Sequence, residues 1–281
     1  MPDSPPPTPK LDLKSAVTLP QPKSTASGRL ELFRVRHLQW SPYTLPIPGL
    51  PAALAGLRIL HLTDLHVDTT WMPAWDRLIE KVQQTRPDLI LITGDFVERK
   101  YDSRPAWPNL RRLLDGFSAR LGVWGILGNH DGDVMGPPLA DMNVRLLANE
   151  LVTLSDGGAS LELVGVHGIS RIDMPPRVRD SIPPKGAGAT RVVMAHYPDQ
   201  LVSLAPLGAD IFLAGHTHGG QVCLPGGWPI MTHDSLPRRF SRGVHRIGQT
   251  WLSVGRGLTY STYPIRLFCP AEAIELTLAA G

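Results

Sequence analysis

The stretch RILHLTDLH (residues 58–66) joins a run of apolar residues to two side chains that often bind metal ions, Asp64 and His66. A short apolar run that ends in a carboxylate and an imidazole is typical of a buried strand with ligands at its carboxyl end. An Asp-x-His tripeptide is weak evidence by itself, because a solvated turn can have the same composition. Its meaning depends on whether similar motifs follow along the chain.

Four further polar motifs follow, each at or near the end of an apolar run. They are Gly94-Asp95, Gly128-Asn129-His130-Asp131, Ala195-His196 and the stretch GHTHGG at residues 215–220. In α/β sheets, ligands gather beyond the carboxyl ends of strands, where loops from separate strands converge. We therefore expect the five motifs to meet in one site.

The segments between the motifs alternate between strand and helix patterns from residue 57 onward, which indicates an α/β fold. The second half is richer in strands, with a hairpin turn at Asp156-Gly157-Gly158. The predicted strands are 30–38, 58–63, 89–93, 122–127, 151–154, 160–166, 191–195, 211–214, 244–247, 251–254 and 273–278. The predicted helices are 73–86, 107–117, 137–149 and 199–205.

The composition is that of an ordinary globular protein of 281 residues, with 19% charged residues. We expect a disordered Pro/Ser-rich tail over residues 1–28 and a single domain over residues 29–281. The formal net charge of +3 suits an anionic substrate and is too weak to indicate a stable nucleic-acid partner. The two cysteines, Cys223 and Cys269, are too few for a disulfide framework; their pairing cannot be read from the sequence, and we expect reduced, partly buried thiols.

The sequence carries no membrane signal that we recognise. Residues 1–10 lack a basic region followed by an apolar one, and the most apolar stretch, 45–60, is interrupted by prolines and glycines. We therefore expect a cytoplasmic protein. A peripheral membrane contact through Trp40, Tyr43 and residues 45–60 is an alternative.

The motifs supply two carboxylates, one amide and several imidazoles, with no cysteine among them. Oxygen and nitrogen ligands of this kind suit hard-to-borderline divalent metals such as manganese, iron or zinc, and the set is large enough for two ions. Two ions with open coordination positions form an arrangement that hydrolyses phosphate esters. The sequence thus predicts the chemistry more sharply than the substrate.

In this order the motifs resemble the calcineurin-like metallophosphoesterases, whose pattern is Asp-x-His, Gly-Asp, Gly-Asn-His-Asp/Glu, His and Gly-His-x-His. The resemblance covers about residues 57–281 and implies a four-layer αββα sandwich with two mixed sheets face to face. Residues 56–59, 255–258 and 264–267 resemble one bacterial branch of phosphodiesterases, whose members often face a membrane. Some members of that branch are described as acting on the pyrophosphate of UDP-2,3-diacylglucosamine.

The resemblance also implies roles for individual residues. The first metal ion would be held by Asp64, His66, Asp95 and His218, and the second by Asp95, Asn129, His196 and His216. A metal-bridging hydroxide would attack phosphorus in line, and His130 would be the catalytic imidazole. Asp131 and Glu98 are both candidates to orient His130, and Arg99 is a candidate to contact phosphate.

Two alternatives for the function stay open at this point. The substrate of the predicted phosphodiester or pyrophosphate hydrolase could be a lipid-linked pyrophosphate at a membrane surface rather than a small molecule. The chain could instead be an inactive metal-binding scaffold, although such a protein should lack a ligand or the His130 imidazole. Outside the motifs, we expect His61 to be a packed core residue, and Arg238, Arg239 and Arg242 to form a solvated loop or to hold an anionic head group.

Overall fold

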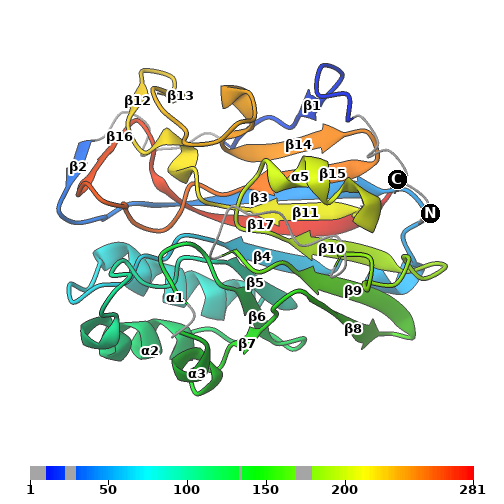
Figure 1. Ribbon diagram of the computed structural model, residues 1–281, viewed down its shortest axis with the longest axis horizontal. Coiled ribbons are helices and arrows are strands. Elements are labelled where there is room, and N and C mark those ends of the chain that lie inside the picture. The colour runs from blue at the N-terminus through cyan, green and yellow to red at the C-terminus, as the bar shows by residue number, and fades with distance from the viewer. Residues whose placement is uncertain (1–10, 23–29, 133–134, 169–178) are drawn as a thin grey trace, which may run out of the picture.

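The structure is a computed structural model that describes residues 11–22, 30–132, 135–168 and 179–281. Two large mixed β-sheets pack face to face, and helices lie on their outer faces (Figure 1). The four-layer αββα sandwich predicted from the sequence is therefore confirmed.

The first sheet has six strands in the order β3-β17-β4-β5-β6-β7, and β4 to β7 run parallel. The strands are β3 (Leu38–Ile47), β4 (Arg58–Leu62), β5 (Leu89–Thr93), β6 (Val123–Ile126), β7 (Arg145–Leu146) and β17 (Ala271–Ala280). Its outer face is covered by α1 (Pro73–Thr85), α2 (Trp107–Asp115) and α3 (Gly136–Ala140). Helix α1 starts with Pro73, whose fixed φ suits a first helical position, and buries Trp75, Leu78 and Val82.

The second sheet has seven strands in the order β1-β14-β15-β11-β10-β9-β8. The strands are β1 (Val17–Thr18), β8 (Glu150–Asp156), β9 (Ala159–Gly165), β10 (Thr190–Met194), β11 (Ile211–Ala214), β14 (Gly243–Ile247) and β15 (Thr250–Val254). Its outer face packs against α5 (Gln200–Ser203) and the 3₁₀ turn η4 (Ala205–Leu207). Two small ribbons lie beside the large sheets: β2 (Leu30–Leu32) with β16 (Ile265–Leu267), and β12 (Cys223–Leu224) with β13 (Trp228–Pro229).

His61 joins the two large sheets inside the core. Its Nδ1 atom lies 3.1 Å from Oγ of Ser253 on β15, and its Nε2 atom lies 3.0 Å from Oγ1 of Thr93 on β5. Burial lowers the pKa of the imidazole to about 3, so the ring is neutral at physiological pH. The prediction that His61 is a packed core histidine is confirmed.

The N-terminal strands differ from the prediction. A single strand was expected at 30–38, but β2 ends at Leu32 and the ten-residue β3 follows. The prolines of β3 hid this strand, yet β3 is at the edge of its sheet, where proline is tolerated. Because side chains alternate along β3, Tyr43 is buried with 6% exposure, so the part of the membrane-contact alternative that names this residue is wrong.

Two other segments also differ. The helix predicted at 137–149 ends at Ala140, and the chain then forms β7 after Asn143, whose φ is 58°. Part of the predicted disordered tail is ordered, because Val17–Thr18 pairs with β14 and the Leu19 amide donates to the Val244 carbonyl. Residues 1–10 and 23–28 of that tail lie outside the described residues. Among the described helices, none has the length and apolar character needed to cross a bilayer.

Candidate metal centre and active site

The five motifs meet at one end of the sandwich, in loops that follow five parallel strands of the two sheets. Asp64 follows β4, Asp95 follows β5 and Asn129 follows β6 of the six-stranded sheet. His196 follows β10 and His216 follows β11 of the seven-stranded sheet. The structure thus brings all the sequence-predicted ligands to the place where loops of both sheets converge.

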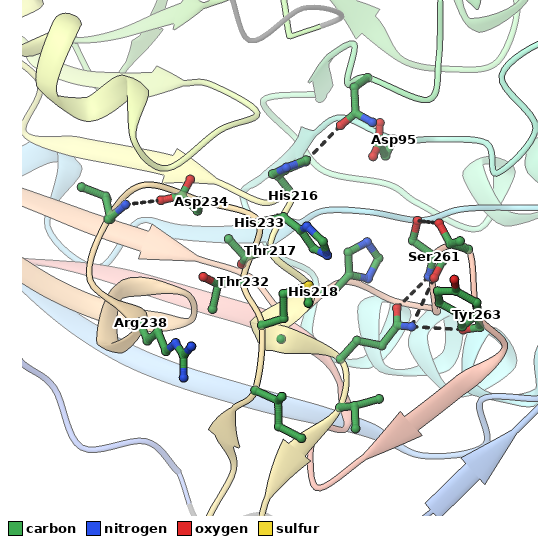
Figure 2. A pocket seen from close by; sticks show the side chains of 18 of the residues that line it. Asp95, His216, Thr217, His218, Thr232, His233, Asp234, Arg238, Ser261 and Tyr263 are labelled. Carbon is green, nitrogen blue, oxygen red and sulfur yellow. Dashed lines mark hydrogen bonds between the residues drawn. The ribbon is translucent and has the colours of Figure 1, made fainter.

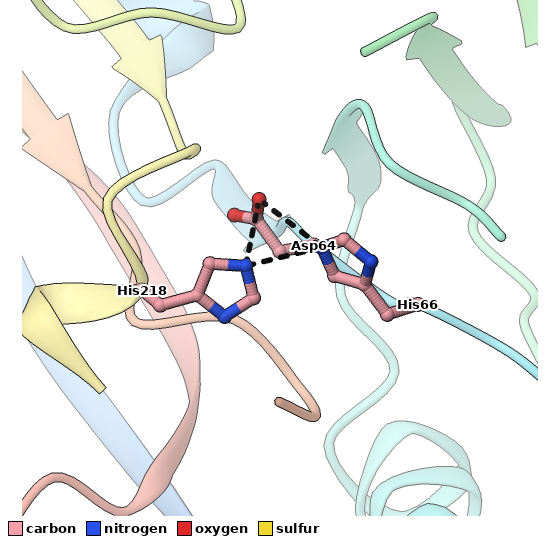
Figure 3. A group of neighbouring side chains, drawn as sticks. All are labelled: Asp64, His66 and His218. Carbon is pink, nitrogen blue, oxygen red and sulfur yellow. Dashed lines mark hydrogen bonds and ion pairs between the residues drawn. The ribbon is translucent and has the colours of Figure 1, made fainter. Parts of the chain in front are cut away.

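Asp64, His66 and His218 form the first group of potential ligands (Figure 3). The His218 Nε2 atom lies 3.4 Å from Oδ1 of Asp64 and 3.0 Å from Nε2 of His66. The three side chains are buried, and their ligand atoms lie within 4.8 Å of one another. Two imidazole nitrogens and a carboxylate oxygen at these separations can bind one divalent cation.

Asp95, Asn129, His196 and His216 form the second group. The Asn129 Oδ1 atom lies 2.9 Å from Nε2 of His196 and 3.0 Å from Nδ1 of His216. The other ring nitrogen of His196, Nδ1, donates to the Thr93 carbonyl at 2.8 Å. This hydrogen bond fixes the tautomer, so the lone pair of Nε2 points toward the group.

Asp95 connects the two groups. Its Oδ2 atom lies 3.4 Å from Nε2 of His66 in one direction and 3.3 Å from Nε2 of His196 in the other. Its Oδ1 atom accepts a hydrogen bond from the His130 amide at 2.7 Å, which holds the carboxylate in place. A single carboxylate in this position can contribute to two cation sites at once.

The ligand loops have an uncommon backbone conformation. Asp64, His66, Asp95, His216 and His218 all have positive φ, between 39° and 66°. This left-handed conformation costs a non-glycine residue about 1–3 kcal/mol, and such residues cluster at functional sites. Neighbouring loops hold the strained segment: the Asp64 amide donates to the Gly94 carbonyl and the His66 amide to the Asp95 carbonyl.

Two glycines allow the loops to approach so closely. A Cβ atom on Gly128 would clash with the carboxylate and amide of Asp95, and one on Gly215 would clash with Thr63 and the Asp64 carboxylate. The glycines in these motifs are therefore required by the packing of the ligand loops.

His130 borders the metal ligands and is oriented by Glu98. The His130 Nδ1 atom lies 2.8 Å from the Glu98 carbonyl, and its ring packs edge-on against His66 with the centroids 4.6 Å apart. The Glu98 carboxylate lies closer to His66 than to His130: its Oε2 atom is 2.6 Å from Nδ1 of His66 and 3.7 Å from Nδ1 of His130. Sequence reasoning considered Glu98 only as a partner of His130 and missed its contact with a metal ligand.

Asp131 has a different place from the one considered for it. Its carboxylate is buried and accepts hydrogen bonds from the backbone amides of Phe96, Val97 and Gly128, at 2.7, 3.2 and 2.8 Å. Burial and the nearby charge of Asp95 raise the pKa of Asp131 to about 7. Asp131 thus ties together the loops that carry Asp95 and Asn129, and no contact with the His130 ring is recorded among the described residues.

The electrostatics of the ligand set fit divalent cations. Burial raises the pKa of Asp64, and the charge of Asp95 raises it further. Burial lowers the pKa of His196, but the carboxylates of Asp95 and Asp64 outweigh this effect and raise it to about 9. The raised pKa values of His196 and His66 favour protonated rings beside the buried carboxylates when no cation is bound, and divalent cations would displace these protons on binding.

A pocket of about 1210 Å³ opens over the ligands (Figure 2). At one end it is lined by Asp95, Asn129, His130, His216 and His218, and it extends over the loops at 230–238 and 261–265. Of the predicted basic cluster, Arg238 lines this pocket, whereas Arg239 donates to the Leu13 carbonyl. Arg99 pairs with Asp68 at 3.0 Å and does not line the pocket.

The two cysteines are free thiols, as predicted, and both are fully rather than partly buried. The Cys223 thiol donates to the Gly219 carbonyl at 3.3 Å and the Cys269 thiol to the His218 carbonyl at 3.2 Å. Both therefore brace the loop that carries His218.

Comparison with known proteins agrees with this geometry. The sequence model of the calcineurin-like phosphoesterases matches residues 57–220, which is more than half of the chain. The chain belongs to the calcineurin-like phosphoesterase family. Because this is a family of phosphoester hydrolases, the buried Asp and His groups are candidate metal sites of a metallophosphoesterase.

Several relatives of this metallophosphoesterase are bacterial. It is 25% identical over 249 residues to the uncharacterized metallophosphoesterase YkuE of Bacillus subtilis (86% of this chain, 85% of that protein). It is 28% identical over 237 residues to the phosphodiesterase YaeI of Escherichia coli (80% and 83%). It is 25% identical over 251 residues to the UDP-2,3-diacylglucosamine pyrophosphatase LpxG of Chlamydia trachomatis (70% and 72%). The chain spans only about 60% of the length of its Campylobacter and Helicobacter relatives.

Proposed function

We propose that this metallophosphoesterase hydrolyses phosphodiester or pyrophosphate bonds with a pair of divalent metal ions. The observation that carries the proposal is the position of Asp95, whose Oδ2 atom lies 3.4 Å from Nε2 of His66 and 3.3 Å from Nε2 of His196. One carboxylate shared by two groups of ligands is the arrangement that a dinuclear centre needs.

The ligands divide between the two ions as follows. Asp64, His66, Asp95 and His218 would hold the first ion, and Asp95, Asn129, His196 and His216 would hold the second. Oxygen and imidazole ligands suit manganese, iron or zinc. Two such ions, when bound, lower the pKa of a bound water and neutralise negative charge on the phosphoryl oxygens.

His130 supplies the proton chemistry. Its Nδ1 atom is occupied by the Glu98 carbonyl, so Nε2 is the atom that can exchange a proton with a substrate in the pocket. A protonated His130 would donate from Nε2 to the leaving oxygen as the phosphorus–oxygen bond breaks. The edge-on contact with His66 keeps the ring beside the metal ligands.

The choice of substrate rests on the relatives. The phosphodiesterase name of YaeI favours a diester, and the pyrophosphatase name of LpxG makes a lipid-linked pyrophosphate the second candidate. An inactive scaffold is disfavoured because the seven ligand side chains and His130 are all present and lie together.

The test is hydrolysis of bis-p-nitrophenyl phosphate beside p-nitrophenyl phosphate, on metal-stripped protein with and without manganese. We expect manganese-dependent hydrolysis that favours the diester. His130→Gln should lower kcat by about 10²-fold or more while bound manganese, measured by elemental analysis, stays at the wild-type level. Hydrolysis of the monoester alone would contradict the proposal, and inactivity toward both compounds with metal bound would favour the scaffold.

A further inference from the structure

The pocket is larger than a phosphoryl group requires. Its volume of about 1210 Å³ lies above the usual range of about 300–1,000 Å³ for small-molecule sites. The metal ligands and His130 line only one part of it. In Figure 2, Asp95 and His216 lie well apart from Arg238 and Tyr263, so the pocket has room for a sizeable substituent on the phosphorus.

The wall away from the metal ligands carries several large apolar side chains among polar ones. Val222, Ile230, Met231, Tyr263 and Ile265 contribute to it. Three of these side chains are strongly exposed: Ile230 at 50%, Met231 at 58% and Tyr263 at 70%. Large apolar side chains exposed together beside a catalytic centre indicate a binding surface, because leaving them in water is unfavourable.

The apolar residues come from two segments that the structure holds side by side. Val222 forms a β-bridge with Leu267, next to Ile265 on β16, and the Ile230 amide donates to the Val222 carbonyl. Gln221 donates to the Ser261 and Tyr263 carbonyls. The wall is therefore a continuous surface that extends from the loop carrying His218.

One cation lines the same pocket, on the side away from Tyr263 (Figure 2). Arg238 is exposed, and within the described parts of the chain no ion pair or hydrogen bond of its guanidinium is recorded. The nearest acidic neighbour along its loop, Asp234, accepts a hydrogen bond from the Leu236 amide. Because it lies apart from Asp95 and His216, the guanidinium can pair with an anionic group on the substituent rather than with the phosphoryl group itself.

We propose that the substrates are amphiphilic phosphodiesters whose hydrocarbon chain lies on the wall formed by Val222, Ile230, Met231, Tyr263 and Ile265. This inference rests on the proposed hydrolase activity, whose substrate class it names. The occupant is the chain of the substrate itself, because the wall and the candidate catalytic residues line one pocket.

The experiment uses alkyl p-nitrophenyl phosphates, from methyl to octyl, with the manganese-loaded protein below the micelle concentration of each ester. In the measured reaction, a water oxygen bonds to phosphorus, the bond to the aryl oxygen breaks, and p-nitrophenolate and an alkyl phosphate leave. We expect kcat/KM to be about 10-fold or more higher for octyl than for methyl, because each added methylene leaves water for the apolar wall.

Single-residue variants test where the alkyl chain of the ester binds. Ile230→Ser and Met231→Ser should bring the octyl-to-methyl ratio of kcat/KM toward one. Leu224→Ser is the matched control, because Leu224 is equally exposed and near in sequence but does not line the pocket; its ratio should equal that of the wild type.

The outcomes separate this inference from the proposed function. A flat series, with every ester hydrolysed at a similar kcat/KM, would overturn the inference and leave the hydrolase activity standing. An octyl-to-methyl ratio that stays at the wild-type value in both serine variants would also overturn the inference, because the alkyl chain of the ester would then bind elsewhere. Failure to hydrolyse any ester would overturn both. If kcat/KM does not depend on alkyl length, but the serine variants weaken binding to phosphatidylglycerol vesicles, the wall would instead be a site that binds a membrane surface.

Discussion

Glu98 is the residue that links a candidate metal ligand, His66, to the candidate catalytic imidazole of His130. Its carboxylate lies 2.6 Å from Nδ1 of His66, and its backbone carbonyl lies 2.8 Å from Nδ1 of His130. Its second carboxylate oxygen accepts a hydrogen bond from the Thr262 amide at 3.0 Å, which anchors the side chain. A carboxylate behind a metal-bound histidine fixes the ring and raises the basicity of the nitrogen that binds the metal.

We therefore expect Glu98→Gln to weaken manganese binding about 10–100-fold, because the amide no longer polarises His66. The backbone contact with His130 remains in this variant, so the loss should appear in metal affinity before it appears in kcat at saturating metal. Manganese titration by calorimetry measures the effect. Glu80→Gln, at an exposed position of α1, is the control, and equal affinities in the two variants would contradict this role of Glu98.

His61 should make the stability of the protein depend on pH. Its folded pKa is about 3, well below the ordinary histidine value, because the ring is buried. The unfolded chain therefore takes up a proton at pH 5 that the folded chain does not, and stability falls as the pH decreases. The expected loss is about 2 kcal/mol between pH 7 and pH 5.

Urea unfolding in EDTA at both pH values measures this loss. His61→Gln keeps polar atoms near Ser253 and Thr93 but does not titrate, so the decrease in its unfolding free energy should be smaller by about the same 2 kcal/mol. An identical pH dependence in the variant and the wild type would show that other groups cause it.

The sequence identifies the candidate ligands but not their backbone conformation. Asp-x-His and Gly-His-x-His name the side chains, and the strand ends predict that they meet. Neither motif predicts that Asp64, His66 and Asp95 have positive φ. A non-glycine residue adopts that conformation only when neighbouring loops hold it. The contact between Glu98 and His66 was missed for the same reason, since it depends on how two loops pack.

At the level of the elements, regular patterns were predictable and proline-containing ones were not. Strands β4, β5 and β11 are short and apolar, and helix α1 has a clear apolar face; each lies within a residue or two of its predicted bounds. Strand β3 contains Pro42 and Pro46 and was missed, because its tolerance for proline comes from its place at the sheet edge. Sheet order is a tertiary property that local patterns do not encode.

The N-terminal strand β1 provides a test at this level. It extends the seven-stranded sheet by pairing with β14, and Leu11, Leu13 and Leu19 pack against the core clusters. We expect a chain that starts at residue 29 to be less stable than the full chain by about 1–3 kcal/mol, because this apolar burial is lost. Urea unfolding measures the difference, and a chain that starts at residue 11 is the control. Equal stability of all three chains would show that β1 contributes nothing.

At the scale of the whole molecule, the candidate centre joins the two sheets. Asp64, His66, Asp95 and Asn129 belong to loops of the six-stranded sheet, and His196, His216 and His218 belong to loops of the seven-stranded sheet. Each proposed ion takes ligands from both sheets, so the sandwich must be assembled before either site is complete. Within each sheet, every loop that carries a ligand directly follows a strand. When the two sheets pack together, these loops therefore meet at one end of the sandwich.

Metal binding should therefore stabilise the folded sandwich as a whole. At a free manganese concentration 100 times the Kd, one site adds about 2.7 kcal/mol to the free energy of unfolding, which corresponds to a rise in Tm of about 5–10 °C for a chain of this size. Calorimetric scans of the stripped protein with and without manganese measure the shift. His216→Gln removes a ligand of the second site only, so this variant should retain part of the rise in Tm. Asp95→Asn changes a ligand shared by both sites, so this variant should lose most of the rise in Tm. A full shift in the Asp95 variant would contradict the bridging role of its carboxylate, since the two ions would then be held independently of it.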